Sequence, residues 1–218
     1  MGRAKEIKVK VIPSNIANDF IRKHHYSGKV VPNSQLHFGA FLDGKLHGVM
    51  SYGPSINKKG TINLVKGTNW NEFIELNRMA FDDYLPKNSE SRCIAISIKL
   101  IKKHAPQIKW IISFADGCSC GDGTIYRASG FVLTDIRENE ALKINPKTGE
   151  KVHTISAYHN NNKEFKNWEP IKGYQLRYLY FIDKNCKKNL TVPIIPFNKI
   201  DEVGAGMYKG HKRQIKNN

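Results

Sequence analysis

A nearly continuous apolar run at residues 108–114 is the feature that most narrows how this chain can fold. It reads Ile-Lys-Trp-Ile-Ile-Ser-Phe and is followed by Ala115 and Asp116. A run of this kind is typical of a central strand that is buried on both faces of its sheet. Because such a strand needs a covering layer on each side, we expect an α/β protein with helices on both faces of a sheet.

Shorter patterns place the other elements around this strand. The Asp43-Gly44 pair between two strand-like runs predicts a hairpin. Apolar residues at helical spacing predict helices that end near His24 and near His104. The expected strands are 7–12, 37–42, 45–52, 73–81, 108–114, a segment after Phe131, and 175–182, and the expected helices are 14–24, 93–104 and 124–129.

The segment 73–81 is expected to alternate as a regular strand. On that basis Glu75 and Asn77 point to one face, whereas Leu76, Arg78 and Ala80 point to the other. The order of all elements predicts a mixed sheet flanked by helices. It resembles the order of the GCN5-related N-acetyltransferase (GNAT) fold.

Length, composition and charge bound the organisation of the chain. Its 218 residues are 40% hydrophobic, which suffices for one buried core. We expect a domain at 1–182 with an insertion at about 134–170, followed by a loose, basic extension at 183–218. The 35 Lys and Arg residues against 19 Asp and Glu give a net charge of +16, which indicates a polyanionic partner.

Other compositional signals exclude whole classes of protein. No run reaches the roughly 18 apolar residues that a membrane span requires, so we expect no membrane association and a cytoplasmic location. The four cysteines are too few for a disulfide framework. Cys118 and Cys120 lack the spacing of a zinc knuckle, and no metal ligands are predicted.

Two charged residues occupy positions in the expected sheet where a charged side chain is unusual unless it binds a ligand or an ion-pair partner. Asp116 follows the central strand at its carboxyl end, where open α/β sheets bind ligands, although it could simply cap the next turn. Arg78 lies on a central strand, where a guanidinium is costly to bury without an anion. It is therefore either paired with Asp116 or Glu75, or directed at a phosphate or a carbonyl.

Two tyrosines complete the set of candidate residues. Tyr126 stands four residues before Gly130 on a short helix, which resembles the acyltransferase segment whose tyrosine protonates the leaving group; packing in the core is the alternative. Tyr26 follows two adjacent histidines at the end of the first helix. Its ring offers a stacking platform, or its hydroxyl a donor, for a base.

Four motifs, in this order and spacing, resemble the Mom family of phage DNA-modification proteins: His25–Gly28, Glu75–Arg78, Ser113–Asp116 and Gly123–Phe131. The resemblance covers about residues 7–133. It implies conversion of adenine in double-stranded DNA to N6-carbamoylmethyladenine, which protects phage DNA from restriction in the host cytoplasm. It also implies catalytic roles for Tyr26, Arg78, Asp116 and Tyr126, and substrate-binding roles for His25, Ser27 and Ser113.

The acyl donor is expected to differ from that of ordinary acetyltransferases. The segment 82–91, where their pyrophosphate loop should stand, has no glycine, and the carboxylates of Asp82 and Asp83 would repel a pyrophosphate. Acetyl-CoA is therefore disfavoured. The product that the resemblance implies has a methylene on N6 and a terminal amide, which favours glycyl-tRNA as donor. Iron is left open, but the eight histidines show no suitable ligand spacing.

In the resulting hypothesis, glycine is transferred to N6 and then rearranges. Asp116 holds the glycine ammonium or takes the N6 proton, and Arg78 polarises the ester carbonyl. Tyr126 protonates the ribose leaving group, and Tyr26 stacks on adenine. Because N6 is paired inside the duplex, the base must be extruded or the DNA melted, with lysines of the basic extension as the first candidates for phosphate contacts.

Three other functions compete with this hypothesis. A non-catalytic DNA-binding protein would account for the charge but not for the coincidence of Arg78, Asp116 and Tyr126. A GNAT acetyltransferase with another substrate is the second. A nuclease with Asp82, Asp83 and Asp116 around a divalent ion is the third.

Overall fold

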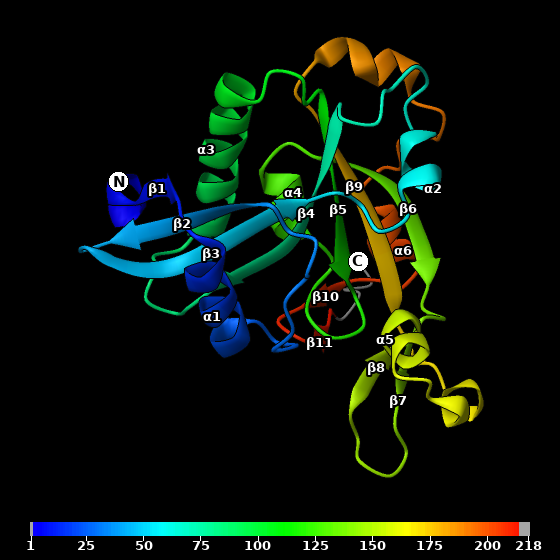
Figure 1. Ribbon diagram of the computed structural model, residues 1–218. Helices are drawn as coiled ribbons and strands as arrows, with labels where there is room; N and C mark the ends of the chain where they lie inside the picture. The colour runs from blue at the N-terminus through cyan, green and yellow to red at the C-terminus, as the bar shows by residue number, and fades with distance from the viewer. Residues whose placement is uncertain (1, 214–218) are drawn as a thin grey trace. The chain divides into compact units, whose positions relative to one another are not determined.

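The computed structural model describes residues 2–213 (Figure 1). The chain divides into two compact units. The first consists of Met1–Phe114, Thr124–Thr134 and Arg177–Ile195. The second consists of Ala115–Gly123, Asp135–Leu176 and Pro196–Asn218. The chain therefore passes between the units several times, and the division falls inside three strands.

A seven-stranded sheet has the order β1-β2-β3-β4-β5-β9-β6. Its strands are β1 Lys8–Val11, β2 Leu36–Leu42, β3 Lys45–Gly53, β4 Phe73–Phe81, β5 Trp110–Asp116, β6 Val132–Glu138 and β9 Tyr174–Phe181. The first four strands pair antiparallel, and β4 pairs parallel with β5, so the sheet is mixed as expected. The predicted central strand lies between β4 and β9. Its residues Trp110 to Ser113 are buried, but Phe114 is exposed.

The helices are η1 Arg3–Glu6, α1 Ser14–His24, α2 Lys58–Ile62, α3 Ser89–His104, α4 Thr124–Ala128, α5 Thr154–His159, η2 Lys163–Asn167, η3 Lys184–Asn189 and α6 Lys199–Glu202. Helix α1 buries Ala17 and Ile21 in a cluster with Val49 of β3. Helix α3 contacts the same strand through Ser97, whose hydroxyl lies 2.6 Å from that of Tyr52. Because residues 49 and 52 point to opposite faces of β3, α1 and α3 cover opposite faces of this part of the sheet.

Strand β4 contains a β-bulge at Asn77. Opposite it, Ser51 pairs with Arg78 whereas the next residue, Tyr52, pairs with Leu76, so Asn77 is an extra residue in the ladder. On its other edge β4 pairs with β5 over four residues, ending at Leu76 and Ser113. There the buried Ser113 hydroxyl donates to the Leu76 carbonyl at 2.8 Å. The bulge therefore coincides with the end of the parallel pairing.

The second unit includes a folded region at the expected insertion. A hairpin of β7 Leu142–Ile144 and β8 Lys151–His153 precedes α5 and η2. These elements have a small apolar cluster of their own, with members Val152, Ala157, Phe165 and Trp168. None of the helices in the described part of the chain combines the length and the apolar character needed to cross a bilayer.

The basic extension is not loose over its described part, which corrects the expectation. In the first unit, Cys186 belongs to a core cluster against which Leu190 packs. In the second unit, β10 Met207–Tyr208 pairs with β11 His211–Lys212. A polyanion-binding role does not require disorder, and apolar residues between the lysines provide enough burial to order the segment. Residues 214–218 of the predicted extension lie outside the described range.

An ion pair fixes the end of this extension within the second unit. The Arg213 guanidinium lies 2.5 Å from a carboxylate oxygen of Asp122, which is almost fully buried, and 3.0 Å from Asp201. The same carboxylate accepts the backbone N–H of Met207. Removing the cation would leave a buried carboxylate with a reduced set of partners.

We therefore predict that Arg213→Ala destabilises the protein by about 2 kcal/mol, less than for a fully buried pair because Arg213 is partly exposed. Urea unfolding at neutral pH measures this loss. Lys212→Ala, at the neighbouring exposed residue, is the control. Equal unfolding midpoints for the two variants would show that the ion pair does not hold the segment.

Candidate active site

The bulge changes which residues of β4 share a face. Cross-strand partners lie on the same face of a sheet, and Gly53 and Ser51, two residues apart, pair with Glu75 and Arg78. Glu75 and Arg78 therefore point to the same face. The sequence-based alternation placed them on opposite faces and is wrong, because the extra residue at Asn77 reverses the alternation between them.

Glu75 and Arg78 interact electrostatically on this face. Burial raises the pKa of the Glu75 carboxyl, while a hydrogen bond with Ser55 and the charge of Arg78 act in the opposite direction. The Arg78 Nε donates to the backbone carbonyl of Lys29 at 2.9 Å, which orients the guanidinium. Arg78 therefore has the carboxyl neighbour that the sequence proposed as one of two partners.

His25 belongs to the same group. Burial, and then the positive charge of Arg78, lower the pKa of His25 to about 4. The imidazole is therefore neutral at physiological pH. The backbone N–H of Ser27 donates to His25 Nδ1 at 3.2 Å, so Nδ1 acts as acceptor and the neutral ring carries its proton on Nε2.

The turn that follows α1 positions these side chains. The Ser27 hydroxyl lies 2.8 Å from His25 Nδ1 and accepts the backbone N–H of Lys29 at 3.3 Å. Gly28 has φ +60, a left-handed conformation that glycine adopts without strain, and its N–H donates to the His25 carbonyl. The motif from His25 to Gly28 is thus a tight turn. The backbone carbonyl of the next residue, Lys29, accepts the hydrogen bond from Arg78.

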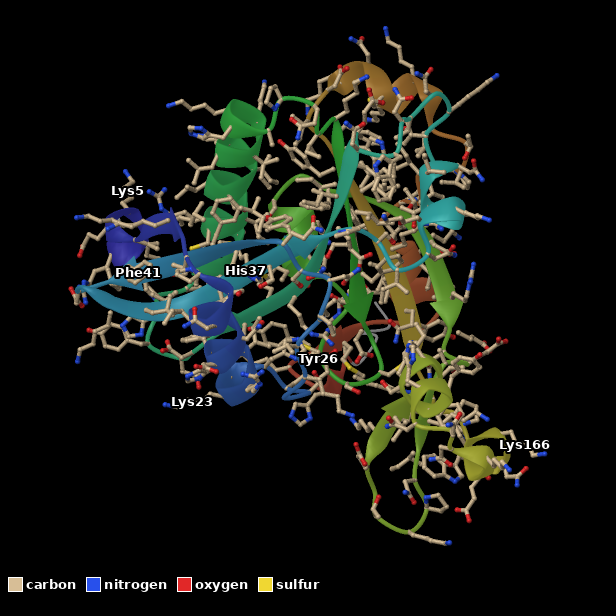
Figure 2. All side chains as sticks on the ribbon, viewed as in Figure 1. Lys5, Lys23, Tyr26, His37, Phe41 and Lys166 are labelled. Carbon is tan, nitrogen blue, oxygen red and sulfur yellow. The ribbon has the colours of Figure 1, made fainter. Side chains whose placement is uncertain are left out.

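Tyr26 differs from its neighbours in exposure. Its ring is 53% exposed and lies 4.3 Å, between ring centroids, from that of His25. Figure 2 labels it on the segment that follows α1. A ring with this exposure is available for a planar ligand to stack on.

Tyr126 and Ser113 lie in the interior of the first unit. The Tyr126 ring on α4 packs against Phe131 and Tyr178, with centroid distances of 5.4 and 5.2 Å. Gly130 ends this segment with φ +84, as expected for a left-handed helix end. The Ser113 hydroxyl donates a hydrogen bond to the Leu76 carbonyl, at the last residue pair between β4 and β5. The arrangement thus includes the packing contacts that the sequence offered as the alternative for Tyr126.

Asp116 belongs to the second unit. Its Oδ1 accepts the backbone N–H of Cys118 at 2.9 Å and the Gln175 side-chain amide at 3.3 Å. This is the turn-capping contact that the sequence gave as its alternative role. Burial, followed by the charge of Asp116, raises the pKa of Cys118 to about 12, so this thiol stays protonated.

The structure thus groups Arg78 with His25 and Glu75. Ser27 hydrogen-bonds His25, and Ser55 hydrogen-bonds Glu75. Sequence reasoning noted Glu75 only as a partner of Arg78 and missed Ser55. No local pattern marks a serine in the segment after β3 that meets a carboxyl of β4. Within residues 2–213, no cluster of three or more His, Cys, Asp or Glu side chains could hold a metal ion.

The lowered pKa of His25 generates a prediction for stability. The unfolded state takes up a proton near pH 6.5 and the folded state only near pH 4, so this contribution to stability is complete above pH 6.5. It declines as pH falls towards 4, with a slope of up to about 1.4 kcal/mol per pH unit. Urea unfolding across this window should show the slope, and His25→Asn should reduce it to the part that remains from His37, whose pKa burial also lowers. An unchanged slope in the variant would contradict a buried neutral imidazole.

Known proteins resemble this chain along most of its length. The model of the Mom protein family matches residues 6–199. The methylcarbamoylase mom of Escherichia phage Mu is 32% identical over 202 residues, which are 88% of this chain and 82% of that protein.

Among solved structures, a spermidine/spermine N-acetyltransferase from Vibrio cholerae has a TM-score of 0.52 at 9% identity, over 86% of this chain and 99% of that one. An IAA acetyltransferase from Bacillus cereus has a TM-score of 0.49 at 12% identity, over 81% and 99%. The match to the spermidine/spermine N-acetyltransferase, together with the mixed seven-stranded sheet flanked by helices, confirms the GNAT-like fold. The family match and the phage Mu relative confirm the resemblance seen in the four sequence motifs: the chain belongs to the Mom protein family.

Proposed function

We propose that this protein is an enzyme that converts adenine in DNA to N6-carbamoylmethyladenine. Family membership supports the reaction class, and the phage Mu relative carries the name methylcarbamoylase. The observation that carries the proposal is the group at the β4 bulge, where Arg78 lies near a neutral imidazole and a half-buried carboxyl. A non-catalytic DNA-binding protein has no need for such a group.

Arg78 is the residue that we assign to the acyl carbonyl. Its Nε is held by the Lys29 carbonyl, so the guanidinium is oriented before substrate binds. A fixed guanidinium stabilises the negative charge that develops on a carbonyl oxygen when a nucleophile attacks it. Because His25 is neutral, it adds no second positive charge beside Arg78.

Glu75 suits the removal of a proton from the attacking amine. Burial raises the pKa of its carboxyl, and a raised pKa makes the carboxylate a better proton acceptor near neutral pH. In this proposal Tyr26 stacks on the adenine, and Tyr126 donates a proton to the leaving oxygen. Asp116 acts on the ammonium group of the donor.

The donor that we favour is glycyl-tRNA, because a single acetyl transfer cannot give the product. Adenine N6 attacks the ester carbonyl, a C–N bond forms, and the tRNA leaves as its ribose hydroxyl. The free glycine amine then attacks C6 through a five-membered ring, and the bond from C6 to the original N6 breaks. The original N6 becomes the terminal amide, and the glycine nitrogen becomes the new N6.

We predict a modified deoxyadenosine in the DNA of cells that express this chain, measured by mass spectrometry of nucleosides. Arg78→Lys should lower its amount about 100-fold or more, since lysine cannot reproduce the fixed fork of donors. Arg22→Lys, at an exposed position on α1, is the matched control and should keep the activity. DNA binding without any modified nucleoside would favour the non-catalytic alternative.

The rearrangement makes a separate prediction with 15N-labelled glycine on tRNA. The label should enter deoxyadenosine, and it should remain there after hydrolysis of the terminal amide, because the labelled nitrogen is attached to C6. A parallel reaction with acetyl-CoA in place of glycyl-tRNA is the control for the identity of the donor. No label in adenine excludes glycyl-tRNA, whereas label that is released as free glycine on amide hydrolysis excludes the rearrangement.

A further inference from the structure

We propose that Ile56, Lys58, Lys59 and Trp70, here called the Trp70 surface, contact the unpaired stretch of DNA around the target adenine. All four residues lie in the first unit, between β3 and β4. The inference rests on the proposed function, since it assigns a substrate-binding surface to the same enzyme. It places DNA contacts on residues outside the basic C-terminal extension that the sequence favoured.

Two large apolar side chains of this surface are exposed. Trp70 is 60% exposed and Ile56 is 64% exposed. The ammonium nitrogen of Lys58 lies 3.0 Å from the centroid of the Trp70 ring, so a cation and an exposed aromatic ring share one position. Exposed tryptophan with lysine is the combination that single-stranded nucleic acids bind, through base stacking and phosphate contacts.

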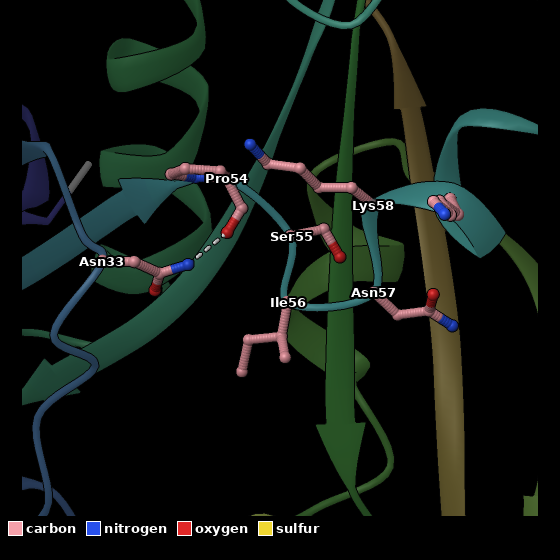
Figure 3. A pocket seen from close by; sticks show the side chains of 7 residues that line it. Asn33, Pro54, Ser55, Ile56, Asn57 and Lys58 are labelled. Carbon is pink, nitrogen blue, oxygen red and sulfur yellow. Dashed lines mark hydrogen bonds between the residues drawn. The ribbon is translucent and has the colours of Figure 1, made fainter.

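An open pocket of about 580 Å³ adjoins these residues (Figure 3). Its lining consists of Asn33, Pro54, Ser55, Ile56, Asn57, Lys58 and Lys59. The lining carries two lysines and no carboxylate, so its charge suits a polyanion. The Asn33 amide donates to the Pro54 carbonyl at 2.8 Å, which ties two sides of the pocket together (Figure 3).

Ser55 connects the pocket to the candidate active site. Ser55 is buried, its hydroxyl lies 3.0 Å from that of Thr61, and it forms a hydrogen bond with Glu75 that opposes the rise in pKa caused by burial of that carboxyl. A strand bound over the lysines would therefore run towards Glu75 and Arg78. That path is the one a DNA strand must take if its adenine is to reach the proposed proton acceptor.

The chemistry of the surface favours unpaired DNA over an intact duplex. Inside a duplex the base faces are stacked on one another, so an exposed indole finds no free face. Because the N6 of adenine is paired, the enzyme must extrude the base, and extrusion exposes the faces of the base and of its neighbours. Stacking on Trp70 would offset part of the unstacking cost.

Tryptophan fluorescence tests this directly. The chain has three tryptophans, and Trp110 and Trp168 are buried, so quenching by acrylamide reports mainly on Trp70. We expect a single-stranded DNA oligonucleotide containing adenine to protect Trp70 from acrylamide. We expect Trp70→Ala to weaken its binding about 10-fold, and Trp70→Phe to weaken it less.

The salt dependence of binding tests the lysines. Lys58→Gln with Lys59→Gln should reduce the slope of log affinity against log salt by about 1.4, the value for two phosphate contacts on a single strand. Lys102→Gln with Lys103→Gln, an exposed pair at the end of α3, removes the same charge and should leave the slope unchanged. Equal changes in both double variants would overturn the proposal.

Other outcomes separate this inference from the proposed function. If Trp70 stays accessible to acrylamide in the saturated DNA complex while deoxyadenosine is still modified, the Trp70 surface is wrong and the enzyme assignment stands. Protection of Trp70 by DNA without any modified nucleoside supports the surface and defeats the enzyme assignment. Protection by an RNA of the same sequence but not by DNA also overturns the proposal.

Discussion

The extra residue in β4 is the feature on which the candidate site depends. Without the bulge at Asn77, regular alternation would place Glu75 and Arg78 on opposite faces of the sheet. The bulge occurs where the parallel pairing with β5 ends, next to the Ser113 hydroxyl that donates to Leu76. One inserted residue thus determines which charged groups meet, while the ladder on either side holds them in place.

Charge acts at two scales in this protein. Over the whole chain, a net charge of +16 favours association with a polyanion and makes that association sensitive to salt. At the site, burial and then the positive charge of Arg78 lower the pKa of His25 and keep it neutral. The same arrangement raises the pKa of Glu75 through burial while Arg78 opposes that shift. The long-range charge suits a polyanionic partner, and the local balance sets the protonation states of His25 and Glu75.

Much of the fold was predictable because its signals are local. The apolar run at 108–114, the Asp43-Gly44 turn and the helical spacing before His104 each identified a real element. Other parts depend on partners distant in sequence. The order in the C-terminal extension comes from contacts such as Arg213 with Asp122, separated by ninety-one positions, which no window of sequence reveals. The exposure of Trp70, in a segment without a strong pattern, likewise appears only in three dimensions.

Residue identities were enough to indicate the family and the α/β class, because motifs and hydrophobic periods are properties of the chain itself. The grouping of Arg78 with Glu75 and His25 was not, since it depends on the register of β3 with β4 and on the turn after α1. Register is set by the pairing of whole strands, and a shift of a single residue reverses every side chain beyond it. For that reason the folded sheet, and no segment of sequence, determines which charges share the site.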